Sequence, residues 1–152
     1  MDWYPWIVFL HVVGAFGFVF GHGASAIVSM AIRRQTDAQR ISAMLRISQL
    51  SLTVMYPSLL LLLAAGVAAG FIGELWGALW LWLAIGLLVV ELAAMYALAA
   101  PYYMNLRRAL TDPTVPDDEV VASMSSSRPI VLAWVGIVGL LLIVWLMVVK
   151  PF

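Results

Sequence analysis

The chain contains no cysteine and few charged residues. Of its 152 residues only 11% are charged, and the formal net charge is +0. Without cysteine, the chain has no disulfides, thiolate metal sites, iron–sulfur clusters or cysteine nucleophiles. A soluble domain is about a quarter charged, so this chain has too little polar surface to cover a globule of its size. The composition therefore excludes a soluble enzyme and a disordered linker, and the neutral charge excludes a basic nucleic-acid-binding protein.

Hydrophobic residues make up 64% of the chain and are concentrated in long runs. About 20 mostly apolar residues suffice to cross a bilayer as a helix. Runs of this length occupy residues 5–32, 50–72, 75–100 and 130–149. None of them alternates with a period of two, so helices are the remaining way to satisfy backbone groups in lipid. We therefore predict one integral membrane domain over residues 1–152, an all-α four-helix transmembrane bundle.

The basic residues predict how the bundle is oriented. Only Lys150 lies outside the two polar segments that join the first span to the second and the third to the fourth. The other seven basic residues are Arg33, Arg34, Arg40, Arg46, Arg107, Arg108 and Arg128. Because cytoplasmic loops are enriched in Lys and Arg, we expect both segments to be cytoplasmic. The helices then run antiparallel, up and down, with both termini on the extracytoplasmic side.

Two further patterns concern local structure. Gly17 and Gly21 form a small-xxx-small motif, which permits close approach of helices in a membrane. In the second polar segment, Asp117, Asp118 and Glu119 follow Pro116. Acidic residues suit the first turn of a helix, so we expect a short helix to begin there.

Ionisable residues within a membrane are costly, so each one is a candidate functional group. Within the predicted spans these are His11, His22 and Glu91, and the chain has no other histidine. A separation of eleven residues is about 20° from three full helical turns, so both histidines lie on one helix face, about 16 Å apart. At that distance they cannot bind one metal ion together, but two separate sites remain possible.

Depth within the membrane suggests which groups lie near one another. Counting about 1.5 Å per residue from the span centres places His22, Tyr56 and Glu91 in one layer. His22 and Glu91 are then a buried polar pair or a proton-transferring pair, or His22 binds a cofactor or metal. His11 is either a haem ligand or hydrogen-bonded to a backbone carbonyl or an interfacial water. Copper is an alternative to haem, although the methionines form no cluster in sequence.

Short motifs in the first two predicted helices resemble a known group of proteins. These are Leu10-His11-Val-Val-Gly14, Pro57-Ser58 and Gly66. The chain resembles uncharacterised bacterial four-helix integral membrane proteins related to the copper-resistance-D proteins and to the HemJ-type protoporphyrinogen oxidases. That resemblance implies a bundle in the bacterial cytoplasmic (inner) membrane that is associated with haem b or copper, with His11 as the shared histidine.

The sequence leaves two functions open, and it does not decide whether the protein is an enzyme. The first is a haem-b-binding membrane protein in electron transfer or haem-linked oxidoreduction, with His11 and His22 as cofactor or metal ligands. The second is a non-enzymatic membrane subunit or a small metal or proton transporter, in which Glu91 pairs with His22 and Tyr56 joins the polar network. Expected partners are membrane lipid and a second copy or a larger membrane complex, and no nucleic acid.

Overall fold

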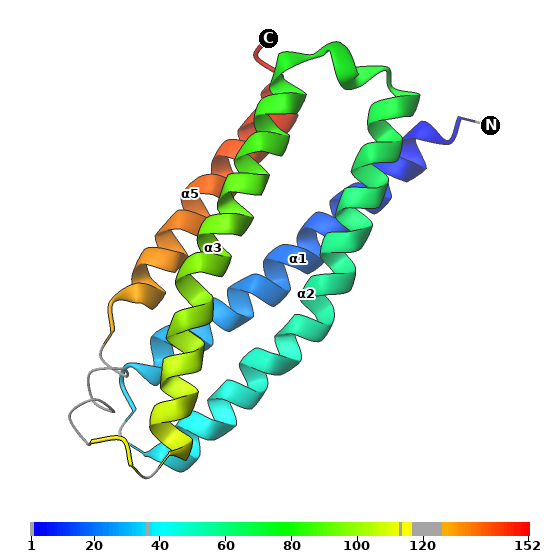
Figure 1. Ribbon diagram of the computed structural model, residues 1–152. Helices are drawn as coiled ribbons and strands as arrows, with labels where there is room; N and C mark the ends of the chain where they lie inside the picture. The colour runs from blue at the N-terminus through cyan, green and yellow to red at the C-terminus, as the bar shows by residue number, and fades with distance from the viewer. Residues whose placement is uncertain (1, 36, 113, 117–125) are drawn as a thin grey trace.

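The computed structural model describes residues 2–35, 37–112, 114–116 and 126–152, and every regular element in these residues is helical (Figure 1). In this part of the chain four helices are long and apolar enough to cross a membrane, which confirms the predicted all-helical fold with four apolar spans. The elements are α1 (Tyr4–Ile32), α2 (Ala38–Ile72), the short 3-10 helix η1 (Leu75–Gly77), α3 (Leu79–Thr111) and α5 (Arg128–Val149). Both labelled ends of the chain lie toward the end of the molecule that carries η1 (Figure 1).

Helix α2 begins twelve residues before the predicted span of 50–72. Asp37 is its N-cap residue, and Oδ1 of Asp37 accepts hydrogen bonds from the backbone N–H groups of Gln39 (2.9 Å) and Arg40 (3.4 Å). A side chain that satisfies these first N–H groups stabilises the start of a helix. Arg40 and Arg46 therefore lie on α2 and not in a loop. Hydropathy marks only the part of a helix that is apolar, so the polar first turns were missed.

Helix α3 also differs from its predicted span of 75–100. Glu74 has a left-handed backbone (φ 53°) and is followed by η1, so α3 begins only at Leu79. It then continues through Pro101 to Thr111. A turn separates α2 from η1, and α2 ends where Gly73 donates its backbone N–H to the Ala69 oxygen over 2.9 Å. The short helix expected at residues 117–119 lies outside the described residues.

The helices pack mainly as two pairs, α1 with α2 and α3 with α5. The pairs are joined at one end of the bundle by a buried cluster of α1, α2 and α3 residues, comprising Ile32, Ile41, Leu45, Tyr102 and Leu106. We call this end the arginine end, because Arg33 and Arg107 adjoin the cluster in sequence. A second buried cluster, Trp80, Leu81, Ala84 and Leu146, lies at the other end of α3. Large apolar side chains elsewhere face outward, as expected of a surface that contacts lipid.

Candidate functional site

Side chains of α1 and α3 meet helix α5 at Gly136. Three side-chain atoms surround the position that a β-carbon on Gly136 would occupy: Cε of Met95 at 2.8 Å, Nε2 of His22 at 3.3 Å and Oε1 of Glu91 at 3.8 Å. The two predicted ionisable residues therefore lie within 4 Å of the same point, although they come from different helices. We call His22, Glu91, Met95 and the glycines of α5 that they contact the His–Glu site.

Gly139 provides the space for the carboxyl group. A β-carbon at Gly139 would lie 2.5 Å from Oε2 and 2.9 Å from Oε1 of Glu91, which is closer than van der Waals contact allows. Any side chain at position 139 would therefore displace the carboxyl group. Gly136 and Gly139 lie three residues apart and thus on one face of α5. This glycine face allows Glu91 to lie against α5.

His22 is half-buried, and its ring stacks on Phe18 with a centroid separation of 6.0 Å and an interplanar angle of 14°. Among the described residues, neither His22 nor Glu91 has a hydrogen bond or an ion pair with a protein group. The two groups converge, yet they do not bond to each other directly. Both retain hydrogen-bonding capacity for a water molecule or a ligand between them.

Tyr56, the third residue of the predicted layer, lies elsewhere. Its side chain on α2 is 60% exposed, and it makes no hydrogen bond to His22 or Glu91. Position 56 is on the outer surface of the α1/α2 pair, where a tyrosine faces lipid. The structure thus brings together two of the three residues.

His11 is packed between α1 and α2. Its Nδ1 lies 2.8 Å from the backbone oxygen of Leu62, and a β-carbon at Gly66 would lie 2.9 Å from its ring. Because a carbonyl oxygen only accepts hydrogen bonds, Nδ1 of His11 donates its N–H to the Leu62 oxygen. His11 contacts α2 whereas His22 faces α5, so the two histidines do not share one neighbouring helix.

A cluster of hydroxyl groups was missed by the sequence analysis. Oγ of Ser25 lies 2.7 Å from Oγ of Ser48 and 3.1 Å from the Tyr103 hydroxyl, which also bonds to Ser29. We call these four residues of α1, α2 and α3 the hydroxyl cluster. Ser25 and Ser29 follow His22 by three and seven residues, a helical spacing that was visible in the sequence. Ser48 was not identifiable, because its segment was predicted to be a loop.

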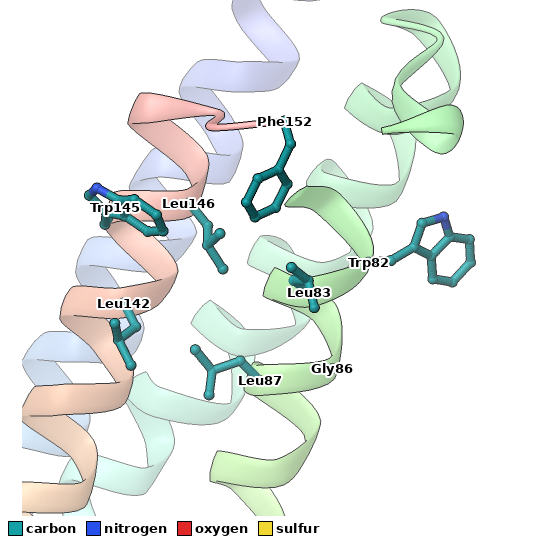
Figure 2. Close-up of a pocket in the computed structure, with 8 residues that line it drawn as sticks. All are labelled: Trp82, Leu83, Gly86, Leu87, Leu142, Trp145, Leu146 and Phe152. Atoms are coloured by element: carbon teal, nitrogen blue, oxygen red, sulfur yellow. The ribbon is translucent and has the colours of Figure 1, made fainter. Parts of the chain in front are cut away.

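Two neighbouring apolar hollows between α3 and α5, which share lining residues and which we call the apolar groove, lie on one side of the His–Glu site. Its larger part has a volume of about 430 Å³ and is lined by Leu87 and Leu142, among others, with Phe152 at its upper end (Figure 2). A smaller part of about 200 Å³ shares Leu87 and Leu142 and is also lined by Glu91 and Gly139. On this side of the His–Glu site the surroundings are therefore apolar.

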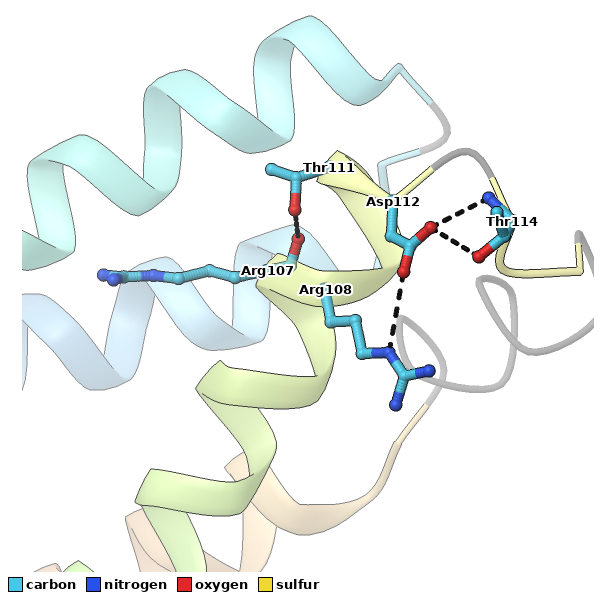
Figure 3. Close-up of polar contacts among 5 residues, drawn as sticks. All are labelled: Arg107, Arg108, Thr111, Asp112 and Thr114. Atoms are coloured by element: carbon cyan, nitrogen blue, oxygen red, sulfur yellow. Dashed lines mark hydrogen bonds and ion pairs between the residues drawn. The ribbon is translucent and has the colours of Figure 1, made fainter.

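The arginine end carries a different type of polar contact, outside the membrane-spanning segments. Oδ1 of Asp112 accepts hydrogen bonds from Oγ1 of Thr114 (2.5 Å) and its backbone N–H (2.9 Å), and Oδ2 lies 3.9 Å from Nε of Arg108 (Figure 3). The Thr114 hydroxyl first, then its N–H and the Arg108 charge, lower the pKa of Asp112. These contacts favour an ionised Asp112 just beyond α3.

The comparisons with known proteins give one result. A family model described as "Predicted integral membrane protein (DUF2269)" matches residues 5–151. No match was found among curated proteins or among solved structures. The matched range covers the four long helices except Tyr4, the first residue of α1, and the family description names no activity or cofactor. Within the described residues, no group of three His, Cys, Asp or Glu side chains is arranged to hold a metal ion.

Proposed function

The chain belongs to this family of predicted integral membrane proteins, and we propose that it is a small membrane transporter or transporter subunit that carries protons through the bilayer by way of His22 and Glu91. The observation that supports this function most directly is the convergence of His22 and Glu91 on Gly136. Ionisable side chains that face the interior of a helix bundle are typical of proton relays.

The chemistry follows from the two groups. A protonated carboxyl group at Glu91 donates its proton to a bridging water molecule, and that water passes a proton to Nε2 of His22. Glu91 is left as a carboxylate and His22 as an imidazolium until the proton moves on. Gly139 allows Glu91 to lie against α5, because a β-carbon there would lie 2.5 Å from Oε2 of Glu91. At Gly136 a β-carbon would lie 3.3 Å from Nε2 of His22, a tight contact. No covalent bond to carbon changes.

We propose that the bundle lies in the bacterial cytoplasmic membrane. The antiparallel, up-down order and the extracytoplasmic position of both termini follow from the enrichment of arginine in the two connections. Lipid covers the outward-facing apolar side chains. A second copy or a larger membrane complex is the expected protein partner.

Proton transport by purified protein in liposomes tests this function. Liposomes are loaded with a pH-sensitive dye, and a potassium gradient with valinomycin drives proton entry. We expect wild-type protein to acidify the interior, and Glu91→Gln or His22→Gln to slow acidification by about a hundred-fold, the scale of a lost proton-transfer group. Glu74→Gln is the matched control, because Glu74 is an exposed glutamate in the turn before η1.

Two results would contradict the proposal. If wild-type protein acidifies liposomes no faster than protein-free liposomes do, the protein is not a proton carrier. If Glu91→Gln and Glu74→Gln acidify at the wild-type rate, protons cross without using the His–Glu site. Folding of each variant is checked by circular dichroism and by its thermal unfolding midpoint.

A second candidate function, haem b binding, is favoured by the hydrogen bond of His11. Metal-ligating histidines almost always donate their second ring N–H to a carbonyl or carboxylate, as Nδ1 of His11 does to Leu62. His11 would then hold the haem iron through Nε2, and His22 is the other proposed ligand. A bound haem would supply one-electron redox chemistry. Copper is the alternative metal, because Met95 and His22 both reach Gly136 and a thioether suits Cu(I).

An absorbance spectrum of purified protein, produced with added haem precursor, tests this candidate. We expect a Soret band that disappears in His11→Ala and persists in Tyr56→Phe, a variant of an exposed residue on α2. The absence of a Soret band in the wild-type protein contradicts haem binding. Bound-metal analysis of the same sample tests copper separately.

A further inference from the structure

The hydroxyl cluster lies on the His22 face of α1, toward the arginine end. Ser25 and Ser29 follow His22 by about 4.5 Å and 10.5 Å along the helix axis. Ile32 comes next on this face and is fully buried in the cluster that joins α1, α2 and α3. Polar groups therefore occupy the interval between the His–Glu site and the packed arginine end.

The four hydroxyl groups are connected to one another by hydrogen bonds. The Tyr103 oxygen contacts Ser25 at 3.1 Å, Ser48 at 3.4 Å and also Ser29, while Ser25 and Ser48 lie 2.7 Å apart. Every hydroxyl group both donates and accepts hydrogen bonds. A proton that reaches one oxygen of this cluster can therefore leave from another, on a different helix.

The cluster is enclosed by protein. Ser29 and Ser48 are only 4% and 6% exposed, and Tyr103 packs against the buried cluster around Ile32 and Leu106. Burial of hydroxyl groups costs free energy unless they are hydrogen-bonded, so these groups depend on one another. The other direction from the His–Glu site leads into the apolar groove, which offers a proton no comparable set of groups.

We propose that the hydroxyl cluster is the relay through which protons pass between His22 and the arginine end of the protein. This inference rests on the proposed proton-carrying function. His22 releases its proton to a water molecule in the one-turn interval before Ser25. Each hydroxyl oxygen then accepts a proton and passes its own to the next oxygen. One proton enters and one leaves, and each hydroxyl is restored by rotation about its C–O bond.

The liposome assay tests the relay with Tyr103→Phe, which removes the shared hydroxyl and keeps the ring. We expect acidification about a hundred-fold slower, the scale of a lost proton-transfer group, in a variant that remains folded at the assay temperature. Tyr96→Phe is the matched control, because it makes the same change on the same helix at a side chain that is 77% exposed. It should acidify at the wild-type rate.

A second pair of variants separates proton transfer from packing. Ser25→Ala removes the hydroxyl at which the proton enters the cluster, and Ser25→Thr retains it, so only the alanine variant should slow acidification. If Tyr103→Phe lowers the unfolding midpoint, the Ser25 pair decides: wild-type rates in both Ser25 variants overturn the relay. Wild-type rates in Tyr103→Phe, with Glu91→Gln slowed, also overturn the relay while the proposed function stands. The failure of wild-type protein to transport protons overturns both.

Discussion

The two helix pairs of the bundle both use glycine where they touch, but for different contacts. In the α1/α2 pair, Gly14 and Gly21 meet the backbone of the other helix. A β-carbon at Gly14 would lie 2.5 Å from the Leu62 nitrogen, and one at Gly21 would lie 2.9 Å from the Ser51 oxygen. In the α3/α5 pair, Gly136 and Gly139 meet the ends of the Met95 and Glu91 side chains.

The glycines of α1/α2 therefore serve helix packing, whereas Gly136 and Gly139 of α5 form part of the His–Glu site. Transmembrane helices associate through van der Waals packing, and glycine allows their backbones to approach closely. In α1/α2 the backbones approach closely at Gly14 and Gly21, and the His11 ring packs against Gly66. In α3/α5 the glycines leave room for a carboxyl group, and the groove beside it remains open. The closely packed α1/α2 pair therefore positions His22, and the α3/α5 pair positions Glu91 near it.

The largest expected effect on stability is in the closely packed α1/α2 pair. Gly14→Ala places a methyl group against the α2 backbone, which cannot yield as a side chain does. We expect it to lower the free energy of unfolding by about 1–3 kcal/mol, the usual cost of overpacking. Reversible unfolding in mixed detergent–SDS micelles measures this change.

Gly23→Ala is the matched control for Gly14→Ala. It lies on the same helix, and a β-carbon there has no neighbour within 4 Å. Alanine is a better helix former than glycine, so Gly23→Ala should be neutral or slightly stabilising. Equal stability of the two variants would show that the α1/α2 backbones are not in tight contact.

A smaller effect on stability is expected at Gly139. Gly139→Ala meets the end of a flexible side chain, so Glu91 can rotate away and the unfolding free energy should fall by less than about 1 kcal/mol. The carboxyl group is then displaced from Gly136, and proton transport should decrease. The unfolding free energy and the liposome acidification rate, measured together, distinguish this variant from Gly14→Ala.

Gly86→Ala on α3 provides the comparison for Gly139→Ala, since a β-carbon at Gly86 also has no neighbour within 4 Å. It adds the same methyl group to the same helix pair without touching Glu91. Both stability and transport should remain at wild-type levels. If Gly139→Ala transports protons as fast as Gly86→Ala, the position of the carboxyl group does not matter for function.

Hydropathy was sufficient to predict the four helices, but not their ends. Four apolar runs stood out because the charges are so few. The start of α2 depends on the Asp37 side chain and the continuation of α3 passes through Pro101, and neither feature changes the hydropathy of a span. Parts of the predicted polar segments are therefore helical, and the position of Ser48 on α2 was not predicted.

The candidate site was predictable in part. His22 and Glu91 stood out because ionisable residues are rare in membranes. A helical period also placed His11 and His22 on one face, but packed helices cross at an angle, so the neighbour of that face changes along α1. The His11 contact with α2, the Gly136 contact with His22 and the meeting of Tyr103 with Ser25 all depend on how helices cross. A single sequence does not contain that information.

Each helix pair has an aspartate in the segment that connects its two helices, Asp37 between α1 and α2 and Asp112 between α3 and α5. The smallest predicted effect is on the pKa of Asp112. Asp37 lies at the start of α2, where the helix dipole favours an anion, whereas Asp112 follows the end of α3, where the dipole opposes one. The lowered pKa of Asp112 must therefore come from its local contacts, chiefly the Thr114 hydroxyl (Figure 3). We expect Thr114→Val to raise this pKa toward its ordinary value of 3.8 without reaching it, because the backbone N–H and Arg108 remain.

The sign of the accompanying stability change follows from the direction of the pKa shift. A carboxyl group with a lowered pKa stabilises the folded state above its unfolded pKa, and this contribution is lost as the pH falls through the folded pKa. Thr114→Val should therefore reduce a contribution present at neutral pH and leave stability unchanged at a pH below both pKa values. Carboxyl-carbon NMR titration of the protein in micelles measures the shift. Thr111→Val is the control, because the Thr111 hydroxyl donates to the Arg107 oxygen and not to Asp112. An equal Asp112 pKa in the two variants would show that the Thr114 hydroxyl does not lower it.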